Sequence, residues 1–146
     1  TEGALIDDPE ATIRILDRFH AEHIRLSIDD FGTGYSSLSQ LGRLSVGELK
    51  IDKSFVQGQG KDRATRVILE AMIRMCSELG FDVVAEGVET EAQLAMLRQW
   101  ACDEVQGFLF SEPVPSVDAE RLLNQVQFFE PVRAPDVRRK GAEHAA

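Results

Sequence analysis

The chain of 146 residues lacks the features that would mark a membrane or secreted protein. No run approaches the roughly 20 apolar residues that a transmembrane helix needs, and no charged and then apolar segment opens the chain as a signal peptide would. Cys76 and Cys102, its only two cysteines, have neither zinc-binding nor redox spacing, so we expect both to be reduced core residues. We therefore expect a cytoplasmic location and no membrane contact by this segment, although upstream segments could anchor a parent protein.

Positive charge is also scarce, because 16 Lys and Arg face 25 Asp and Glu, for a net charge of -9. A surface without basic patches cannot displace counterions from a phosphate backbone, which argues against binding to a DNA or RNA duplex. An anionic ligand would need a local source of positive charge to bind to this acidic chain. The hydrophobic share of 43% is enough to bury the core of one domain or of part of one.

Strand and helix patterns alternate along the chain, which predicts a parallel sheet with helices outside it. We expect helices at residues 8–23, 61–79, 91–100 and 118–126, a short helix from Ser36, and strands at 24–28, 48–52, 81–85 and 105–110. In the helix at 61–79 we expect one apolar stripe, formed by Val67, Ile68, Ala71, Met72, Met75 and Leu79, and a left-handed cap at Gly80. Residues 127–146 show no periodicity and are expected to be a flexible tail.

Charged side chains stand at the downstream ends of three of these strands: Asp29 and Asp30, then Lys50, then Glu86. The carboxyl ends of parallel strands meet on one face of an α/β barrel, so these groups should share a pocket. The adjacent aspartates would point to opposite sides of a regular strand, in which case one caps a turn and the other faces solvent. Clustered carboxylates instead require a cation or raised pKa values, and oxygen ligands suit magnesium, manganese or calcium. Lys50 either compensates their charge or acts on a water.

Four motifs then occur in order: DDFGTGYSSL at 29–38, LKIDKSF at 49–55, VAEGVET at 84–90 and QGFLF at 106–110. Together they resemble the EAL-domain family of cyclic di-GMP phosphodiesterases, which act in bacterial second-messenger signalling. The resemblance covers residues 1 to about 125. It implies that residues 1–126 are the C-terminal portion of a TIM-type (β/α) barrel, roughly its last four βα units.

The resemblance also implies a role for each matching residue. Asp29, Asp30 and Glu86 would be metal ligands, with Asp29 bridging two ions of Mg²⁺ or Mn²⁺. Lys50 would orient or activate the attacking water and Gln106 would lie beside it, in a two-metal hydrolysis of cyclic di-GMP to linear pGpG. Glu2 would support the loop at 31–38, and Glu89 and Asp52 match motif positions with less defined roles.

The sequence departs from the family pattern at its start. The glutamate of the Glu-Ala-Leu motif, a metal-binding asparagine and a further glutamate would all precede Thr1, so we expect a truncated fragment that is inactive alone. A half-barrel also leaves open edges and apolar surface, which favours a homodimer or domain contacts in the parent protein. The alternative is a noncatalytic cyclic di-GMP receptor or protein-interaction domain. A third alternative is an unrelated magnesium-dependent barrel enzyme acting on a small phosphorylated metabolite.

Overall fold

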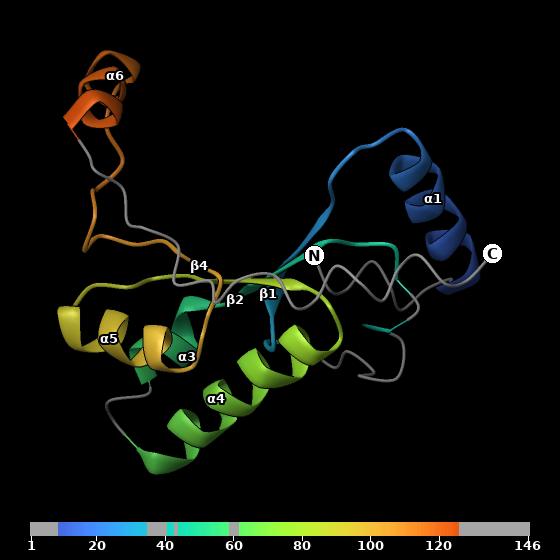
Figure 1. Cartoon of the computed structure of the whole chain (residues 1–146), viewed down its shortest axis with the longest axis horizontal. Helices are drawn as coiled ribbons and strands as arrows, with labels where there is room; N and C mark the ends of the chain where they lie inside the picture. The colour runs from blue at the N-terminus through green and yellow to red at the C-terminus, as the bar shows by residue number, and fades with distance from the viewer. Residues whose placement is uncertain (1–8, 35–40, 43, 59–61, 126–146) are drawn as a thin grey trace.

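The structure is a computed structural model, and it describes residues 9–34, 41–42, 44–58 and 62–125 (Figure 1). The loop-supporting Glu2, the short helix expected from Ser36 and the expected tail at 127–146 lie outside the described residues.

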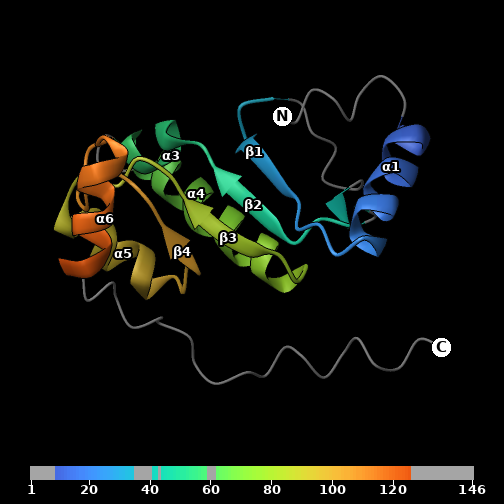
Figure 2. The ribbon, with the colours of Figure 1, turned by 90° about the horizontal axis from the view of Figure 1, so that it is seen from above.

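The described part of the chain contains a four-stranded sheet in which every neighbouring pair of strands is parallel. The strand order follows the chain, as Figure 2 shows from above. In that order the strands are β1 (Ser27–Phe31), β2 (Glu48–Ile51), β3 (Asp82–Ala85) and β4 (Glu104–Val105). The parallel α/β arrangement that the alternating pattern predicts is therefore confirmed.

The helices are α1 (Pro9–Ala21), α3 (Lys53–Gly58), α4 (Arg63–Glu78), α5 (Glu91–Gln99) and α6 (Ser116–Gln125). Figure 1 shows α3, α4 and α5 on the same side of the sheet, with α1 and α6 at opposite ends of the molecule. No helix in these described segments is long and apolar enough to cross a bilayer. Four of the helices match expected ones, whereas α3 was not predicted from the sequence.

Helix α4 packs on the sheet with a different face from the one expected. Leu69, Ile73 and Cys76 are fully buried, whereas Val67 and Ile68 are 54% and 47% exposed. Two apolar stripes run along this helix at helical spacing, and the sheet covers the one that begins at Leu69. Of the expected stripe, Met72 and Met75 do pack against the core, but Val67, Ile68 and Leu79 are exposed, so the prediction is wrong at those three positions.

The end of α4 confirms the expected cap. Gly80 has a φ of 89°, its N–H donates to the Ser77 carbonyl at 3.1 Å, and the Phe81 N–H donates to the Cys76 carbonyl at 3.1 Å. This pair of bonds is the Schellman arrangement, which satisfies carbonyls that the last turn leaves free. It also sends the chain back toward the sheet at Asp82.

Strands β2 and β3 are each one residue shorter than expected, and the other two strands differ more from their expected bounds. Strand β1 covers 27–31 in place of 24–28, so the acidic pair lies inside the strand and not after it. Strand β4 covers 104–105 in place of 105–110, because the chain turns once the Gln106 carbonyl has accepted the Val88 N–H at 3.0 Å. The next residues form a tight turn, closed by the Phe110 N–H on the Gly107 carbonyl at 3.1 Å.

The core lies between the sheet and its covering helices. Buried side chains of β2 and β3 meet those of α3, α4 and α5; the innermost include Leu49, Ile51, Val56, Leu69, Ile73, Val83, Val88 and Leu97. Cys76 and Cys102 are free, buried thiols in this core, as the sequence predicts.

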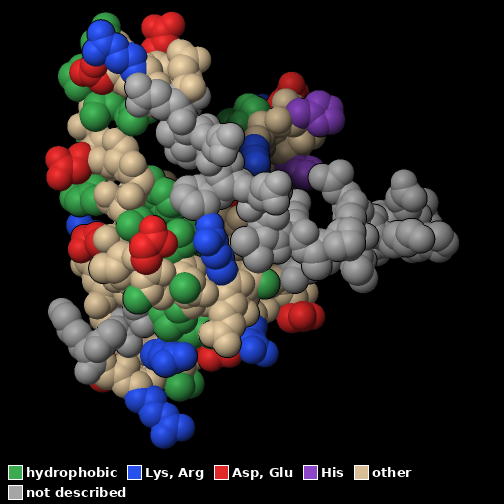
Figure 3. Space-filling view, turned by 60° about the vertical axis from the view of Figure 1, so that its left-hand side comes forward, with side chains coloured by type: hydrophobic (Ala, Val, Ile, Leu, Met, Phe, Trp, Pro, Cys, Tyr) green, Lys and Arg blue, Asp and Glu red, His purple; other side chains and the backbone are tan. Residues whose placement is uncertain are grey.

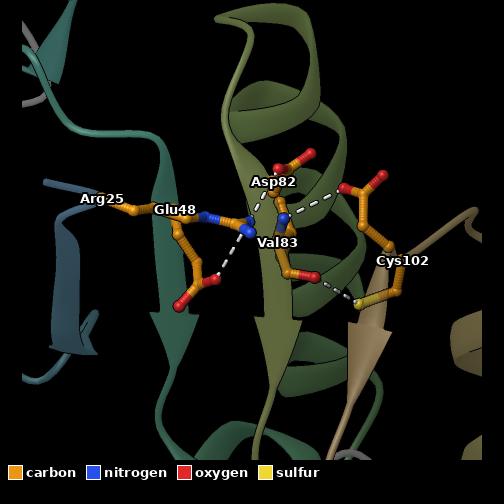
Figure 4. A network of polar contacts seen from close by, with 6 residues as sticks. Arg25, Glu48, Asp82, Val83 and Cys102 are labelled. Carbon is orange, nitrogen blue, oxygen red and sulfur yellow. Dashed lines mark hydrogen bonds and ion pairs between the residues drawn. The ribbon is translucent and has the colours of Figure 1, made fainter. Parts of the chain in front are cut away.

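A polar network stabilises the amino-terminal ends of the strands (Figure 4). Nη2 of Arg25 lies 3.2 Å from Oε2 of Glu48 and 2.9 Å from Oδ2 of Asp82, so one guanidinium connects β2 and β3. Beside it, the Val83 N–H donates to Oδ2 of Asp103 at 3.0 Å, and the Cys102 thiol approaches the Val83 carbonyl. The acidic pair of β1 and Lys50 of β2 lie nearer the other ends of these strands.

Large apolar side chains remain exposed near α6. Phe108, Val114 and Val117 are 61%, 41% and 66% exposed. Figure 3 shows hydrophobic side chains among charged ones on the side of the molecule that includes α5 and α6. Such surface is compatible with the expected homodimer or domain contacts, which stay a prediction.

Candidate metal site

The side chains of Asp29 and Asp30 extend to the same side of β1 because this strand is irregular at Asp30. Asp30 has a φ of 56°, and the pairing of β1 with β2 shifts register between Ile28 and Phe31. In a regular strand adjacent side chains alternate between faces, and the left-handed backbone at Asp30 breaks that alternation. The Asp30 carbonyl accepts the Thr33 N–H at 3.3 Å and the Thr33 hydroxyl at 2.9 Å, which holds the turn after the strand.

Glu86 completes a cluster of carboxylates with Asp29 and Asp30. One oxygen from each of the three side chains lies within 4.8 Å of the others. Glu86 follows directly after β3, and its N–H donates to the Ile51 carbonyl of β2 at 3.1 Å. A set made only of carboxylate oxygens is the donor chemistry that Mg²⁺, Mn²⁺ and Ca²⁺ prefer.

Lys50 of β2 lies between the carboxylates of the two neighbouring strands. Its Nζ is 2.8 Å from Oδ1 of Asp29, and it also forms an ion pair with Glu86. Hydrogen bonds to Asp29 and then to Glu86 raise the pKa of Lys50, and the hydrogen bond from Lys50 lowers the pKa of Asp29. The ammonium of Lys50 therefore lies where it can offset the charge of two carboxylates, and an action on a water stays a prediction.

Gln106, just after β4, is the last expected member of the group. Its Nε2 donates to Oε1 of Glu86 at 2.8 Å, and its backbone N–H donates to the Ala85 carbonyl at 3.0 Å. Asp29, Asp30, Lys50, Glu86 and Gln106 are thus linked in one group at or just beyond the carboxyl ends of the strands.

Asp52 and Glu89 have contacts outside this cluster. Oδ1 of Asp52 accepts the Ser54 N–H at 2.9 Å, which caps α3, and hydrogen bonds from Ser54 lower the pKa of Asp52. Oε1 of Glu89 accepts a hydrogen bond from Nε2 of Gln57 at 2.7 Å. Within the part of the chain that the structure describes, the possible metal-binding group contains neither carboxylate.

Gln57 and Gln93 contact the loop that carries Glu86, and neither was predicted from the sequence. Gln93 had a detectable signal, because Thr90 and Gln93 have the spacing of a capping box and do form one. Gln57 had none, since α3 itself was not expected.

Comparison with known proteins identifies the family to which this chain is similar. Residues 1–113 match the family described as "EAL domain". Cyclic di-GMP phosphodiesterase NbdA of Pseudomonas aeruginosa is 46% identical over 128 residues, which are 88% of this chain and 16% of that protein. This chain thus spans about a sixth of the length of that relative.

Solved structures of EAL domains, which are TIM-type barrels, share the fold. The PaMucR phosphodiesterase in complex with c-di-GMP has a TM-score of 0.75 and 42% identity, over 79% of this chain and 47% of that one. Klebsiella pneumoniae BlrP1 in its manganese and cy-diGMP complex has a TM-score of 0.67 and 36% identity, over 75% of this chain and 28% of that one. A calcium and cy-diGMP complex of the same protein is also similar. The chain belongs to the EAL domain family.

Proposed function

We propose that this chain supplies part of the active site of a metal-dependent phosphodiesterase that opens cyclic di-GMP to linear pGpG. The observation that carries the proposal is the joining of five polar groups from four strands, with the Asp29, Asp30 and Glu86 oxygens within 4.8 Å of one another. The names of NbdA and of the PaMucR complex, which specify cyclic di-GMP, support the substrate.

The donor set fits divalent cations. Asp29, Asp30 and Glu86 would hold Mg²⁺ or Mn²⁺, since all three present carboxylate oxygens and their mutual repulsion favours a bound cation. When bound, two such ions supply charge neutralisation at the phosphate and lower the pKa of a water. Manganese and calcium in the two BlrP1 complexes support divalent metal use, and Mg²⁺ is our extension of it.

Lys50 and Gln106 have contacts that suit orienting roles. Hydrogen bonds from Lys50 to Asp29 and Glu86 raise its pKa and place its ammonium beside both candidate ligands, where it can orient or activate a water or stabilise developing negative charge. Gln106 donates one Nε2 hydrogen to Glu86 and retains a second amide hydrogen with which to orient substrate or water. We therefore assign Lys50 to orientation or activation of the attacking water, with Gln106 beside it.

Substrate binding should depend on the cations. Cyclic di-GMP carries two phosphate charges, which the carboxylates of Asp29, Asp30 and Glu86 would repel in the absence of metal. We expect the three carboxylates alone, with Lys50 bound to two of them, to bind Mn²⁺ weakly. A cytoplasmic location is part of the same proposal, as is a homodimer or contacts between domains in the parent protein. Gel filtration with light scattering would measure the assembly.

The decisive experiment measures hydrolysis of cyclic di-GMP to pGpG with Mn²⁺ by the protein in its full natural length. Asp29→Asn and Lys50→Ala should each abolish turnover, whereas the control Glu112→Gln, at an exposed residue, should leave it unchanged. Full turnover by Asp29→Asn would refute the metal assignment. Tight binding of cyclic di-GMP without any hydrolysis by the wild type would instead support a noncatalytic receptor.

A further inference from the structure

The loop at residues 86–90 joins β3 to α5 and begins with the candidate ligand Glu86. It packs directly on the start of α3: a Cβ placed on Gly87 would lie 2.4 Å from Cβ of Lys53, and Gly87 has a φ of 73°. Only glycine fits this close approach and this backbone conformation without displacing α3. The position of the loop is therefore tied to the neighbouring helix.

Gln93, in the first turn of α5, holds the far end of this loop with its side-chain amide. Its Oε1 accepts the N–H of Glu89 at 2.8 Å and the N–H of Thr90 at 2.9 Å. Its Nε2 lies 3.4 Å from the Val56 carbonyl of α3. A capping box needs only the bond to Thr90, so the contacts with Glu89 and Val56 exceed what the helix requires.

The buried position of Gln93 makes these bonds consequential. Gln93 is 9% exposed, so water cannot easily replace a bond that it loses. A buried donor or acceptor left without a partner costs about 1–3 kcal/mol. A displacement of the 86–90 loop should therefore require a displacement of the Gln93 side chain as well.

Gln57 holds the same loop from the other side. This residue of α3 donates from Nε2 to Oε1 of Glu89 at 2.7 Å. Glu89 is thus bound through its backbone by Gln93 of α5 and through its side chain by Gln57 of α3. Two glutamines on different helices fix one residue of the loop.

A chain of hydrogen bonds connects the held end of the loop to the site. Between Glu86 and Glu89, the Val88 N–H donates to the Gln106 carbonyl at 3.0 Å, and Val88 accepts the Leu109 N–H at 3.0 Å. The side chain of Gln106 in turn donates to Glu86 at 2.8 Å. A displacement of Glu89 would therefore be transmitted to the carboxylate of Glu86 through only a few bonds.

We propose that Gln93 and Gln57 are positioning residues, which hold the 86–90 loop so that the Glu86 carboxylate stays beside those of Asp29 and Asp30. This inference rests on the proposed function, because it concerns the cation that these carboxylates would bind. Neither glutamine belongs to the carboxylate cluster, so both act through the loop. Loss of a partner bonded directly to a metal ligand typically weakens metal affinity by about 10–100-fold, and because Gln93 and Gln57 act on Glu86 through the loop, we expect the lower end of that range.

The test compares Gln93→Leu with Gln99→Leu in the protein of full natural length. Gln99 is an exposed residue at the end of the same helix, so it gives a matched control. We expect Gln93→Leu to weaken Mn²⁺ binding by about tenfold in calorimetry, with the control unchanged. Amide hydrogen exchange should show faster exchange at Glu89 and Thr90 in Gln93→Leu alone.

A second variant separates positioning from a general loss of packing. Gln93→Glu keeps an oxygen that can accept both N–H groups, while it replaces the donor to Val56 by a charged oxygen. It should therefore restore the protection of Glu89 and Thr90 and part of the Mn²⁺ affinity that Gln93→Leu loses. If Gln93→Glu binds Mn²⁺ as poorly as Gln93→Leu, the accepting oxygen is not what matters and the proposal fails. It also fails if Gln93→Leu exposes these amides and still binds Mn²⁺ like the wild type.

Gln57→Leu covers the case in which Gln93→Leu does not fold. It removes only the contact from α3 to Glu89, and we expect weaker Mn²⁺ binding with an unchanged melting temperature. Wild-type affinity in Gln57→Leu would then overturn the proposal. Absence of Mn²⁺ binding by the wild-type protein itself would refute the proposed function instead. Failure of the positioning proposal and failure of the proposed function therefore give different results.

Discussion

Lys50 and Asp29 lie 21 residues apart in the sequence and form an ion pair across two strands, with Nζ of Lys50 2.8 Å from Oδ1 of Asp29. Lys50 also binds Glu86, so one ammonium occupies two of the three carboxylates that would hold a cation. A cation and this ammonium therefore stabilise the same negative charge. They must compete for it unless the side chain of Lys50 moves aside.

Replacement of Lys50 by methionine should tighten metal binding while it removes turnover. Without the ammonium, Asp29, Asp30 and Glu86 repel one another, and a bound cation relieves more of that repulsion. We expect a lower Kd for Mn²⁺ in calorimetry and a larger rise of the melting temperature on addition of Mn²⁺.

Lys53→Met is the matched control for that substitution. Lys53 is exposed at the start of α3 and belongs to none of the ion pairs found in the described residues, and methionine keeps the Cβ against which Gly87 packs. It should leave the Kd for Mn²⁺ unchanged. Equal Kd values for wild type and Lys50→Met would mean that the ammonium does not compete with the metal.

The grouping of the site residues was predictable, because the carboxyl ends of parallel strands meet at one edge whatever the details of each strand. What the sequence could not reveal is why both aspartates of β1 contribute. That depends on the φ of 56° at Asp30 and on the register shift after Ile28, which no periodicity encodes. A regular strand would have left only one of the two carboxylates in the cluster.

The packed face of α4 was not predictable for a different reason. The sequence of this helix has apolar residues at helical spacing on two faces, and periodicity alone cannot say which of them meets the sheet. The structure buries Leu69 and Ile73 and exposes Val67 and Ile68. Strand β4 was overestimated because its apolar run, Phe108 to Phe110, belongs to a turn around Val88.

Ala101 is a place where one substitution should stabilise the protein. It ends α5 with a φ of 57°, its N–H donates to the Arg98 carbonyl at 3.0 Å, and the Cys102 N–H donates to the Leu97 carbonyl at 3.0 Å. A left-handed alanine is strained where glycine is not, so Ala101→Gly should raise the free energy of unfolding by about 1 kcal/mol. Urea denaturation would measure the change.

Ala95→Gly is the control for that prediction. Ala95 is exposed in the middle of the same helix, where glycine should lower the free energy of unfolding by about 1 kcal/mol. The same Ala→Gly substitution should therefore change the free energy of unfolding in opposite directions at Ala101 and Ala95. A loss of stability in both variants would show that the backbone of Ala101 is not strained in solution.

Gly107 should tolerate no side chain, because of what lies against it. A Cβ at this position would lie 2.2 Å from the carbonyl oxygen and 2.3 Å from the nitrogen of Val88, both of which are backbone atoms. Gly107→Ala must push Val88 away from Gln106, and this breaks the link between the 86–90 loop and the site. We expect weaker Mn²⁺ binding, loss of turnover and reduced stability.

Gly80→Ala separates that clash from backbone strain alone. Gly80 also has a positive φ, of 89°, but its added Cβ would meet nothing within 4 Å. It should cost about 1 kcal/mol of stability and leave Mn²⁺ affinity unchanged, since it lies at the other end of β3 from Glu86. Calorimetry on both variants tests this, and equal Mn²⁺ affinities for the two would contradict the clash at Val88.

The two buried thiols should make the protein less stable as the pH rises. Burial raises the pKa of Cys76 to about 11 and that of Cys102 to about 12, whereas the thiol of an exposed cysteine has a pKa of about 8.5. Between these values the unfolded chain has lost protons that the folded protein retains, so the free energy of unfolding falls with pH. The stabilisation is complete below about pH 8.5 and is lost progressively as the pH approaches the folded-state values.

Urea denaturation of the wild type and of Cys102→Ala at pH 7.5, 9 and 10 would measure this effect. The variant should start less stable, because it loses buried contacts, and then decline less steeply with pH, because it has one raised thiol pKa fewer. Alkylation by iodoacetamide at pH 8 gives an independent check, since both thiols should react in urea and neither in the folded protein. Parallel declines for the two proteins, or rapid native alkylation of Cys102, would mean that this thiol is not held neutral between β3 and β4.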